Sequence, residues 1–221
     1  MTDPIIIIGM QRSGTSWLAR TLHAQGVEMY DWDFGNYAED GDIWGWNSVE
    51  MLANKVNQKS MPFEHTPSKH FITRLEAYAD YRDKGKPWGF KEPRIAMLLG
   101  AYAQVFPAAK YICCVRNVMS LIWSQVGRNN NLAAARDSQY IAPVVLRMCN
   151  VAYVSEQQGL DIHYFNYDAE IGGEQEAMST FLGMPLDLSS FKRSEAKRGY
   201  AGGDKAPSYE VIRFDPEETK I

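Results

Sequence analysis

Four consecutive isoleucines near the start of the chain constrain the fold more than any other feature. Residues 5–8 read as a strand that is apolar on both faces, which is typical of the buried centre of a parallel sheet. The strand ends at Gly9, and a short loop leads to Thr15 and Ser16, where we expect a helix to begin. Because the first N–H groups of a helix lack internal partners and carry partial positive charge, this stretch predicts a site for one phosphate or sulfate group.

The loop differs from the Walker loop of nucleoside triphosphatases at the position that carries the charge. Gly9 and Gly14 have the Walker spacing, but Thr15 stands where the Walker pattern has its lysine. The cation comes earlier instead, at Arg12, directly before Ser13. A kinase or ATPase without that lysine would lose its main contact to the outer phosphates, so the pattern disfavours the Walker type.

Length, charge and cysteine content bound the class of protein. A chain of 221 residues fits one well-buried α/β domain, so we predict a single domain over 1–221, with 190–221 largely irregular. The net charge of −4 gives no general attraction for nucleic acid, and no apolar run approaches the ~20 residues of a membrane span. Three cysteines without disulfide or zinc spacing indicate a reducing compartment, and we expect a cytoplasmic protein. Since the first strand starts near residue 4, we expect no signal peptide or membrane anchor.

Strand and helix patterns alternate along the rest of the chain. We expect strands over 88–91, 110–115 and 162–165, and helices over 69–83, 95–106, 140–158 and 174–182. This alternation predicts a three-layer α/β/α fold with a central parallel sheet. On the longest helix we expect one face to be mostly core, and its positions at helical spacing are Ile141, Val144, Val145, Met148, Ala152 and Ser155.

Three residues with suitable chemistry follow predicted strands. Gly9, Lys91 and Arg116 each lie at or just beyond the carboxyl end of a strand. Ligands of parallel α/β sheets bind beyond these ends, so we expect the three positions to converge.

Two motifs of this chain resemble nucleotide-binding elements of the sulfotransferase family. The run R-S-G-T-S-W from Arg12 to Trp17 resembles the family's phosphosulfate loop, with Gln11 in place of its proline. Arg116 and Ser124, in the pattern R-N-x(6)-S, resemble the element that binds the ribose 3′-phosphate. The chemistry is suitable, because a guanidinium makes forked, charge-assisted bonds to phosphate and a hydroxyl adds a neutral one.

Further segments resemble sulfotransferase motifs and follow in the same order along the chain. Tyr167, in a strand end that resembles the family's Y-E-D, would contact the adenine, and Asp168 replaces the usual glutamate. Trp17 would stack on the adenine, although core packing would also explain it. The segment with Lys197, Arg198 and Gly199 resembles a basic C-terminal loop that in the family folds over the 3′-phosphate. A flexible basic tail is the alternative.

The resemblance implies a P-loop NTPase-like sulfotransferase fold and a specific donor. The donor would be 3′-phosphoadenosine 5′-phosphosulfate (PAPS), the product 3′,5′-phosphoadenosine (PAP), and the acceptor a hydroxyl or amine of a small molecule or carbohydrate. No metal is required. The residues that would cradle the 5′-phosphosulfate are Arg12, Ser13, Gly14, Thr15, Ser16 and Trp17.

The catalytic roles follow from the same resemblance. Arg12 would stabilise the leaving 5′-phosphate and Lys91 would touch the sulfuryl group. Glu39 is our candidate for the general base, because acidic neighbours and an apolar wall would raise its pKa. The rivals for that role are Glu92, His65 and His70.

Two other classes remain open at this point. A small nucleotide or sugar kinase would share the loop and predicts magnesium-dependent triphosphate binding. A non-catalytic relative would bind 3′,5′-phosphoadenosine without transferring a group.

Overall fold

The computed structural model describes residues 3–29, 47, 66–121, 124 and 138–189, with side chains described from 144 onward in the last of these ranges. Several predicted residues lie outside the described part: Glu39, His65, Lys197, Arg198, Gly199 and the whole of 190–221.

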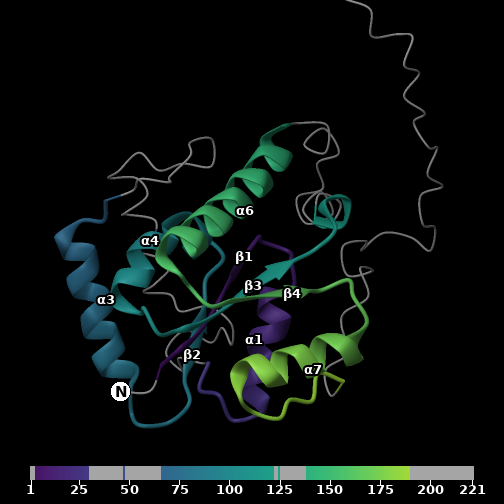
Figure 1. Ribbon diagram of the computed structural model, residues 1–221, viewed down its shortest axis with the longest axis horizontal. Coiled ribbons are helices and arrows are strands. Elements are labelled where there is room, and N and C mark those ends of the chain that lie inside the picture. Colours follow the sequence, from purple (N-terminus) through teal and green to yellow (C-terminus); the bar gives the residue numbers. More distant parts are fainter. Residues whose placement is uncertain (1–2, 30–46, 48–65, 122–123, 125–137, 190–221) are drawn as a thin grey trace, which may run out of the picture.

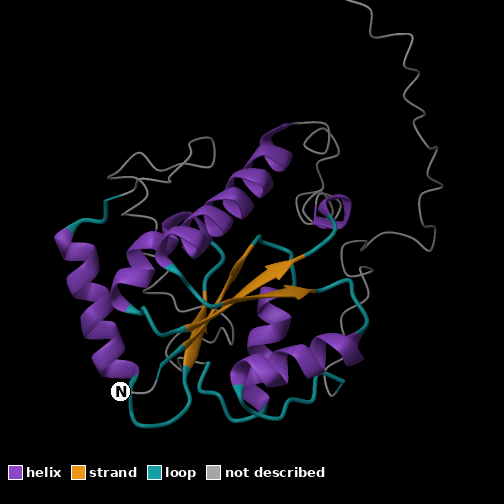
Figure 2. Ribbon diagram, in the orientation of Figure 1, coloured by secondary structure: helices purple, strands orange, loops and turns teal. Residues whose placement is uncertain are grey.

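Four parallel strands form one sheet in the order β2-β1-β3-β4. The strands are β1 (Ile5–Gly9), β2 (Gly89–Lys91), β3 (Lys110–Val115) and β4 (Ile162–Asn166). Figure 2 shows them side by side between the helices. Since β1 lies between β2 and β3, the loop that follows β1 begins at the middle of the carboxyl edge.

Helices cover both faces of the sheet, which confirms the predicted three-layer α/β/α fold (Figure 1). One face carries α1 (Thr15–Ala24) and α7 (Ile171–Leu182). The other carries α3 (Lys69–Arg82), α4 (Ile95–Val105) and α6 (Ser138–Gln158). None of the described helices has the length and apolar character that a membrane crossing requires.

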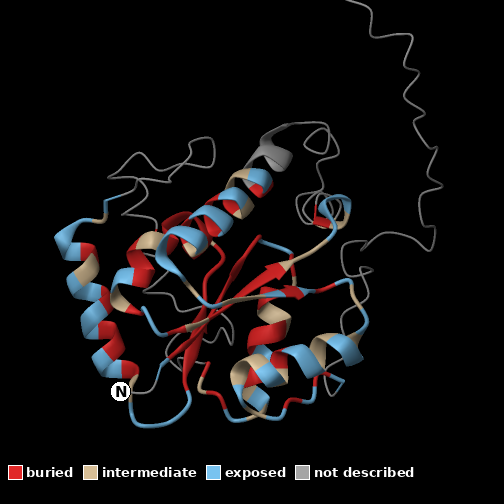
Figure 3. Cartoon of the chain, in the orientation of Figure 1, coloured by how far each residue is buried: buried red, intermediate tan, exposed pale blue. Residues whose placement is uncertain are grey.

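The isoleucine strand is buried on both of its faces, as predicted (Figure 3). Ile6 and Ile8 belong to the core between the sheet and α3, α4 and α6. Ile5 and Ile7 belong to the core under α1 and α7. The alternation of side chains along the strand thus fills two cores at once, and β1 is fixed at the centre of the fold.

Most element boundaries lie within three residues of those predicted, and β3 matches its predicted range. The largest difference is at α7, which begins at Ile171 rather than near 174. Gly172 and Gly173 favour turns, yet both are accommodated in the first turn of this helix.

The buried face of α6 agrees with the predicted one at Val144 and Met148 and differs from it at Val145 and Ala152, where the expectation is wrong. Val145 is 51% exposed and Ala152 is also exposed. Arg147 and Asn150 are buried instead, and Asn150 Nδ2 donates a hydrogen bond of 2.7 Å to the backbone oxygen of Ala96 in α4. The buried face of α6 thus includes a polar contact with α4, which the spacing of apolar residues does not predict.

The orientation of α6 can be tested with two valines. Val151→Ala removes methyl groups from a fully buried site, so we expect the free energy of unfolding to fall by about 2 kcal/mol. Val145→Ala, at the exposed site, should change it by no more than about 0.5 kcal/mol. Urea denaturation of both variants measures the difference, and equal losses would contradict the observed face.

Candidate functional site

The loop after β1 forms a tight turn that ends at an uncapped helix. Ser13 is buried, and its hydroxyl donates to the backbone oxygen of Met10 at 2.6 Å, which closes the turn. Gly14 occupies the N-cap position of α1 in the left-handed conformation, with φ of 95°, and contributes no side-chain cap. The first N–H groups of α1 thus lack the side-chain acceptor that usually caps a helix, which is the arrangement that suits a bound anion. Thr15 begins α1, as the sequence predicts.

Gly14 also touches the end of β4. A Cβ atom at Gly14 would lie 2.1 Å from Cδ2 of Tyr167, so any larger residue would displace the tyrosine ring. Trp17 stacks on Phe165, with 5.9 Å between ring centroids and 11° between planes, and meets Tyr167 edge-on. The predicted adenine contacts Trp17 and Tyr167 are therefore neighbours in one aromatic cluster beside the loop.

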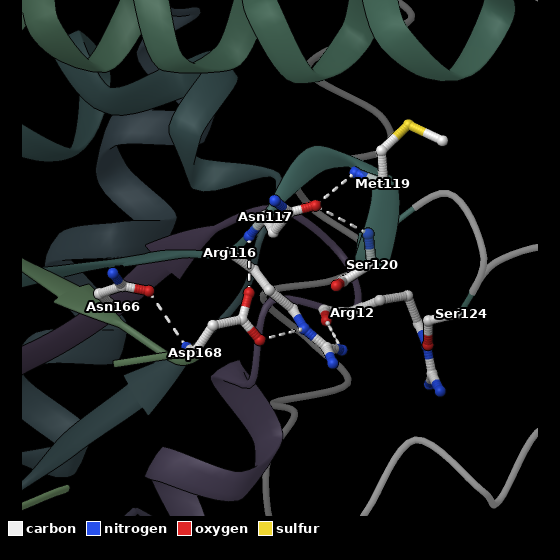
Figure 4. A network of polar contacts seen from close by, with 8 residues as sticks. All are labelled: Arg12, Arg116, Asn117, Met119, Ser120, Ser124, Asn166 and Asp168. Carbon is white, nitrogen blue, oxygen red and sulfur yellow. Dashed lines mark hydrogen bonds and ion pairs between the residues drawn. The ribbon is translucent and has the colours of Figure 1, made fainter. Parts of the chain in front are cut away.

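The two predicted phosphate-binding elements meet in the structure (Figure 4). Arg12 Nε donates to Ser124 Oγ at 2.8 Å, and Arg116 Nη1 donates to the backbone oxygen of Arg12 at 3.2 Å. Arg12 itself has a φ of 73°, in the left-handed region that residues other than glycine rarely adopt. Strained backbone of this kind is typical of ligand-binding loops.

Asp168 holds Arg116 in place from the end of β4 (Figure 4). Its Oδ1 atom forms an ion pair of 3.1 Å with Arg116 Nε, and its Oδ2 accepts from the backbone N–H of Asn117 at 2.8 Å. The Arg116 guanidinium also lies 5.0 Å from the ring centroid of Tyr167, within cation–π range. The Asn117 side chain in turn accepts from the N–H groups of Met119 and Ser120, which begin the next helical turn.

A second group of polar residues surrounds the end of β2. Lys91 and Glu92 are 1% and 2% exposed. Glu92 Oε1 accepts from both the backbone N–H and the Nε of Arg94, and Oε2 accepts from Asn47 Nδ2 at 2.6 Å. Tyr102 completes the group by donating to Asn47 Oδ1 at 2.6 Å. Both oxygens of Glu92 are thus bonded within the protein, which argues against Glu92 as the base that takes a substrate proton.

The other candidates for the general base are placed less centrally or not described. His70 is exposed in the first turn of α3, an outer helix of its layer. Glu39 and His65 lie outside the described residues. The assignment of Glu39 stays a prediction.

Metal binding and thiol chemistry find no support in the described part of the chain. No group of three or more His, Cys, Asp or Glu residues there is placed to hold a metal ion. Burial raises the pKa of Cys113 to about 12 and also raises that of Cys114, so both stay protonated and unreactive.

Sequence reasoning missed the contact of Asp168 and the burial of Arg147. Asp168 was noted only as a replacement for glutamate, although its place directly after Tyr167 puts a carboxylate at the same sheet edge as Arg116. Arg147 was not considered, because an arginine within a helix is normally solvated. A signal was available at Asp168, whereas none marked Arg147.

Comparison with known proteins gives a family match. The sequence matches the model of the sulfotransferase family over residues 4–187. The chain belongs to this family. A search of curated proteins finds no match.

Solved structures with a similar fold include three sulfotransferases. The sulfotransferase domain of the Synechococcus PCC 7002 olefin synthase is 17% identical, with a TM-score of 0.50 and coverage of 92% of this chain and 80% of that one. Sulfotransferase STF1 of Mycobacterium tuberculosis H37Rv is 15% identical, with a TM-score of 0.46 and coverage of 90% and 70%. Sulfotransferase STF9 of Mycobacterium avium is 12% identical, with a TM-score of 0.48 and 84% of this chain covered, and the match spans 64% of its length. The fold of this chain is thus the P-loop-like fold of the sulfotransferases.

The contact between Gly14 and Tyr167 gives a stability prediction. Gly14→Ala should lower the free energy of unfolding by about 2–4 kcal/mol, because the methyl group would overlap the tyrosine ring and the backbone is left-handed. Gly172→Ala is the matched control. Its Cβ meets nothing within 4 Å and it lies in a helix, so it should stabilise by up to about 1 kcal/mol. Urea denaturation checks both, and an unchanged Gly14→Ala variant would contradict the close packing.

Proposed function

We propose that the protein is a sulfotransferase that moves a sulfuryl group from PAPS to a hydroxyl or amine of a small-molecule or carbohydrate acceptor. One observation carries the proposal beyond family membership. Arg116 Nη1 lies 3.2 Å from the backbone oxygen of Arg12, so the two elements suited to the 5′- and 3′-phosphates adjoin. A ligand with two phosphates on one ribose fits this arrangement better than a linear triphosphate does.

The 5′ side of the nucleotide would be bound by the loop after β1. The uncapped N–H groups at the start of α1 supply hydrogen bonds and partial positive charge, and Arg12 adds a full charge beside them. Gly14 has no side chain, so the backbone of the loop can come close to the phosphate. A side chain at this position would overlap Tyr167. These residues fit a phosphosulfate without a metal ion.

The 3′-phosphate would be bound by Arg116 and Ser124. Arg116 uses two of its N–H groups on Asp168 and on Arg12, and within the described residues the others remain for phosphate oxygens. The Ser124 hydroxyl accepts from Arg12 and can donate its own hydrogen to a phosphate at the same time. Asp168 keeps the guanidinium plane fixed, so little side-chain freedom is lost on binding.

In the transfer step the protein would position the reactants and stabilise charge. PAPS supplies an activated sulfuryl group: the acceptor oxygen or nitrogen bonds to sulfur while the bond from sulfur to the 5′-phosphate oxygen breaks. Arg12 and the α1 N-terminus would stabilise the negative charge that collects on that phosphate. Lys91, buried at the end of β2, would neutralise charge on the sulfuryl oxygens. Glu39 would accept the proton that the acceptor loses.

The experiment that tests the proposal compares two nucleotides and then turnover. PAP should raise the melting temperature of the full chain by several degrees at saturating concentration, whereas ATP with magnesium should have little effect, since Thr15 stands in place of the Walker lysine. Larger stabilisation by ATP and magnesium would favour a kinase. Release of PAP from PAPS in the presence of an acceptor panel, with Lys91→Met as the inactive control, separates an enzyme from a non-catalytic binder.

The role of Arg116 gives a sharper prediction. Arg116→Ala should weaken PAP about 10–100-fold, the usual value of hydrogen bonds to a charged group, and weaken adenosine 5′-monophosphate far less. Arg20→Ala, which removes an exposed arginine from α1, is the control and should leave both affinities unchanged. Isothermal titration of the wild type and both variants measures the six constants, and equal losses for the two nucleotides in Arg116→Ala would remove Arg116 from the 3′-phosphate site.

A further inference from the structure

Arg147 of α6 is a buried cation without a partner in the described part of the chain. The residue is only 2% exposed, and its Nε atom is buried and donates no hydrogen bond to the described residues. Among the described residues, no hydrogen bond or ion pair involves Arg147. Because burying an unpaired guanidinium is costly, native proteins normally pair such a group. A bound ligand can supply the pairing group that the described residues do not give Arg147.

Neighbouring contacts place Arg147 at the carboxyl edge of the sheet. Val144, three residues before it, belongs to a buried cluster with Met10, the residue directly after β1. Asn150, three residues after it, is bonded to the backbone oxygen of Ala96 in the first turn of α4. Residues three apart on a helix share a face, so Arg147 lies between the end of β1 and the start of α4. Figure 1 shows α6 lying along α4 on this side of the sheet.

The charged groups that act on Arg147 within the described part of the chain are the carboxylate of Glu92 and the guanidinium of Arg94. Glu92 is already ion-paired to Arg94 at 3.0 Å. Burial lowers the pKa of Arg147, the field of Glu92 opposes this shift, and Arg94 adds to it, which agrees with a cation that is incompletely compensated.

A second unsatisfied atom lies one helical turn away. Asn150 Oδ1 is buried and has no donor in the described part of the chain, while the amide nitrogen of the same side chain is bonded to α4. The shared face of α6 thus presents a donor, at Arg147, and an acceptor, at Asn150. Buried polar atoms are almost always bonded, so this pair indicates a polar molecule rather than packing.

We propose that Arg147 binds an acidic group of the acceptor, so that the acceptor of the sulfuryl transfer is an anionic molecule. This inference rests on the proposed function. A carboxylate matches the forked geometry of a guanidinium, and an N–H or O–H of the same molecule would donate to Asn150 Oδ1. The apolar cluster of Met10, Leu121 and Val144 lies beside this face of α6, on the side of the β1 loop. The sulfuryl group of the donor is the other possible oxyanion, and the experiment separates the two.

The first test needs no ligand. If Arg147 serves a ligand rather than the fold, Arg147→Met should leave the melting temperature of the full chain unchanged or raise it by about 2–4 °C, because an unpaired buried charge is replaced by an apolar chain. Arg94→Met, which breaks the ion pair with Glu92, is the matched control and should lower it. A fall in Arg147→Met would mean that Arg147 stabilises the fold, and would overturn the inference.

The second test measures anion recognition in the PAP-saturated protein. Three hydroxy acids are each compared with a neutral counterpart by isothermal titration: 4-hydroxybenzoate with its amide, lactate with lactamide, and glucuronate with glucose. We expect at least one acid to bind about tenfold more tightly than its counterpart in the wild type, and Arg147→Gln to abolish that preference. No preference in the wild type, or a preference that survives in Arg147→Gln, overturns the inference.

The donor is examined with the same variant. Arg147→Gln should bind PAP and PAPS as the wild type does, within about twofold. A loss for PAPS alone would assign Arg147 to the sulfuryl group and overturn the acceptor role. Failure of wild-type protein to bind PAP would instead defeat the proposed function, and the melting experiment would still decide whether Arg147 is structural.

Discussion

The site depends on one guanidinium that joins the ends of three strands. Arg116 follows β3, bonds to the backbone of the loop after β1, and is ion-paired with Asp168 after β4. Because each strand is fixed by the two cores of the sheet, these contacts are set by the fold rather than by the loops alone. Asp168 offsets part of the charge of Arg116, so an anion bound there shares the guanidinium with a carboxylate that orients it. The arrangement therefore gives up some electrostatic attraction in return for a fixed geometry.

The two sides of the carboxyl edge differ in how their polar groups are satisfied. Around Arg116, the ion pair with Asp168 and the backbone contacts account for much of the hydrogen bonding. Around the end of β2, Glu92 is fully bonded, whereas Arg147 and Asn150 Oδ1 are buried without partners among the described residues. Under the proposed function, the first side would bind the nucleotide. The second side would bind the acceptor, as inferred for Arg147.

The fold could be predicted from the sequence where the signal is local. The isoleucine strand, the glycine turn and the start of α1 at Thr15 follow from periodicity and backbone preferences within twenty residues. The strand over 110–115 is found for the same reason. The places of Arg116 and Asp168 after predicted strands put both at one sheet edge, but their ion pair also requires β3 and β4 to be neighbours, which the sequence does not show. The face of α6 was predicted only in part, because apolar spacing alone cannot show that Arg147 and Asn150 are buried while Val145 is exposed.

The hydroxyl of Ser124 has a consequence for selectivity under the proposed function. It accepts from Arg12, which would bind the 5′ side, and its own hydrogen can then be donated to a phosphate on the 3′ side. An anion that repositions Arg12 would therefore also reorient the Ser124 hydroxyl, and linkage requires the influence to run equally in both directions. The two halves of a bisphosphorylated ribose would reinforce each other's binding, and a nucleotide that lacks one of its phosphates would forfeit more than the contacts of that phosphate.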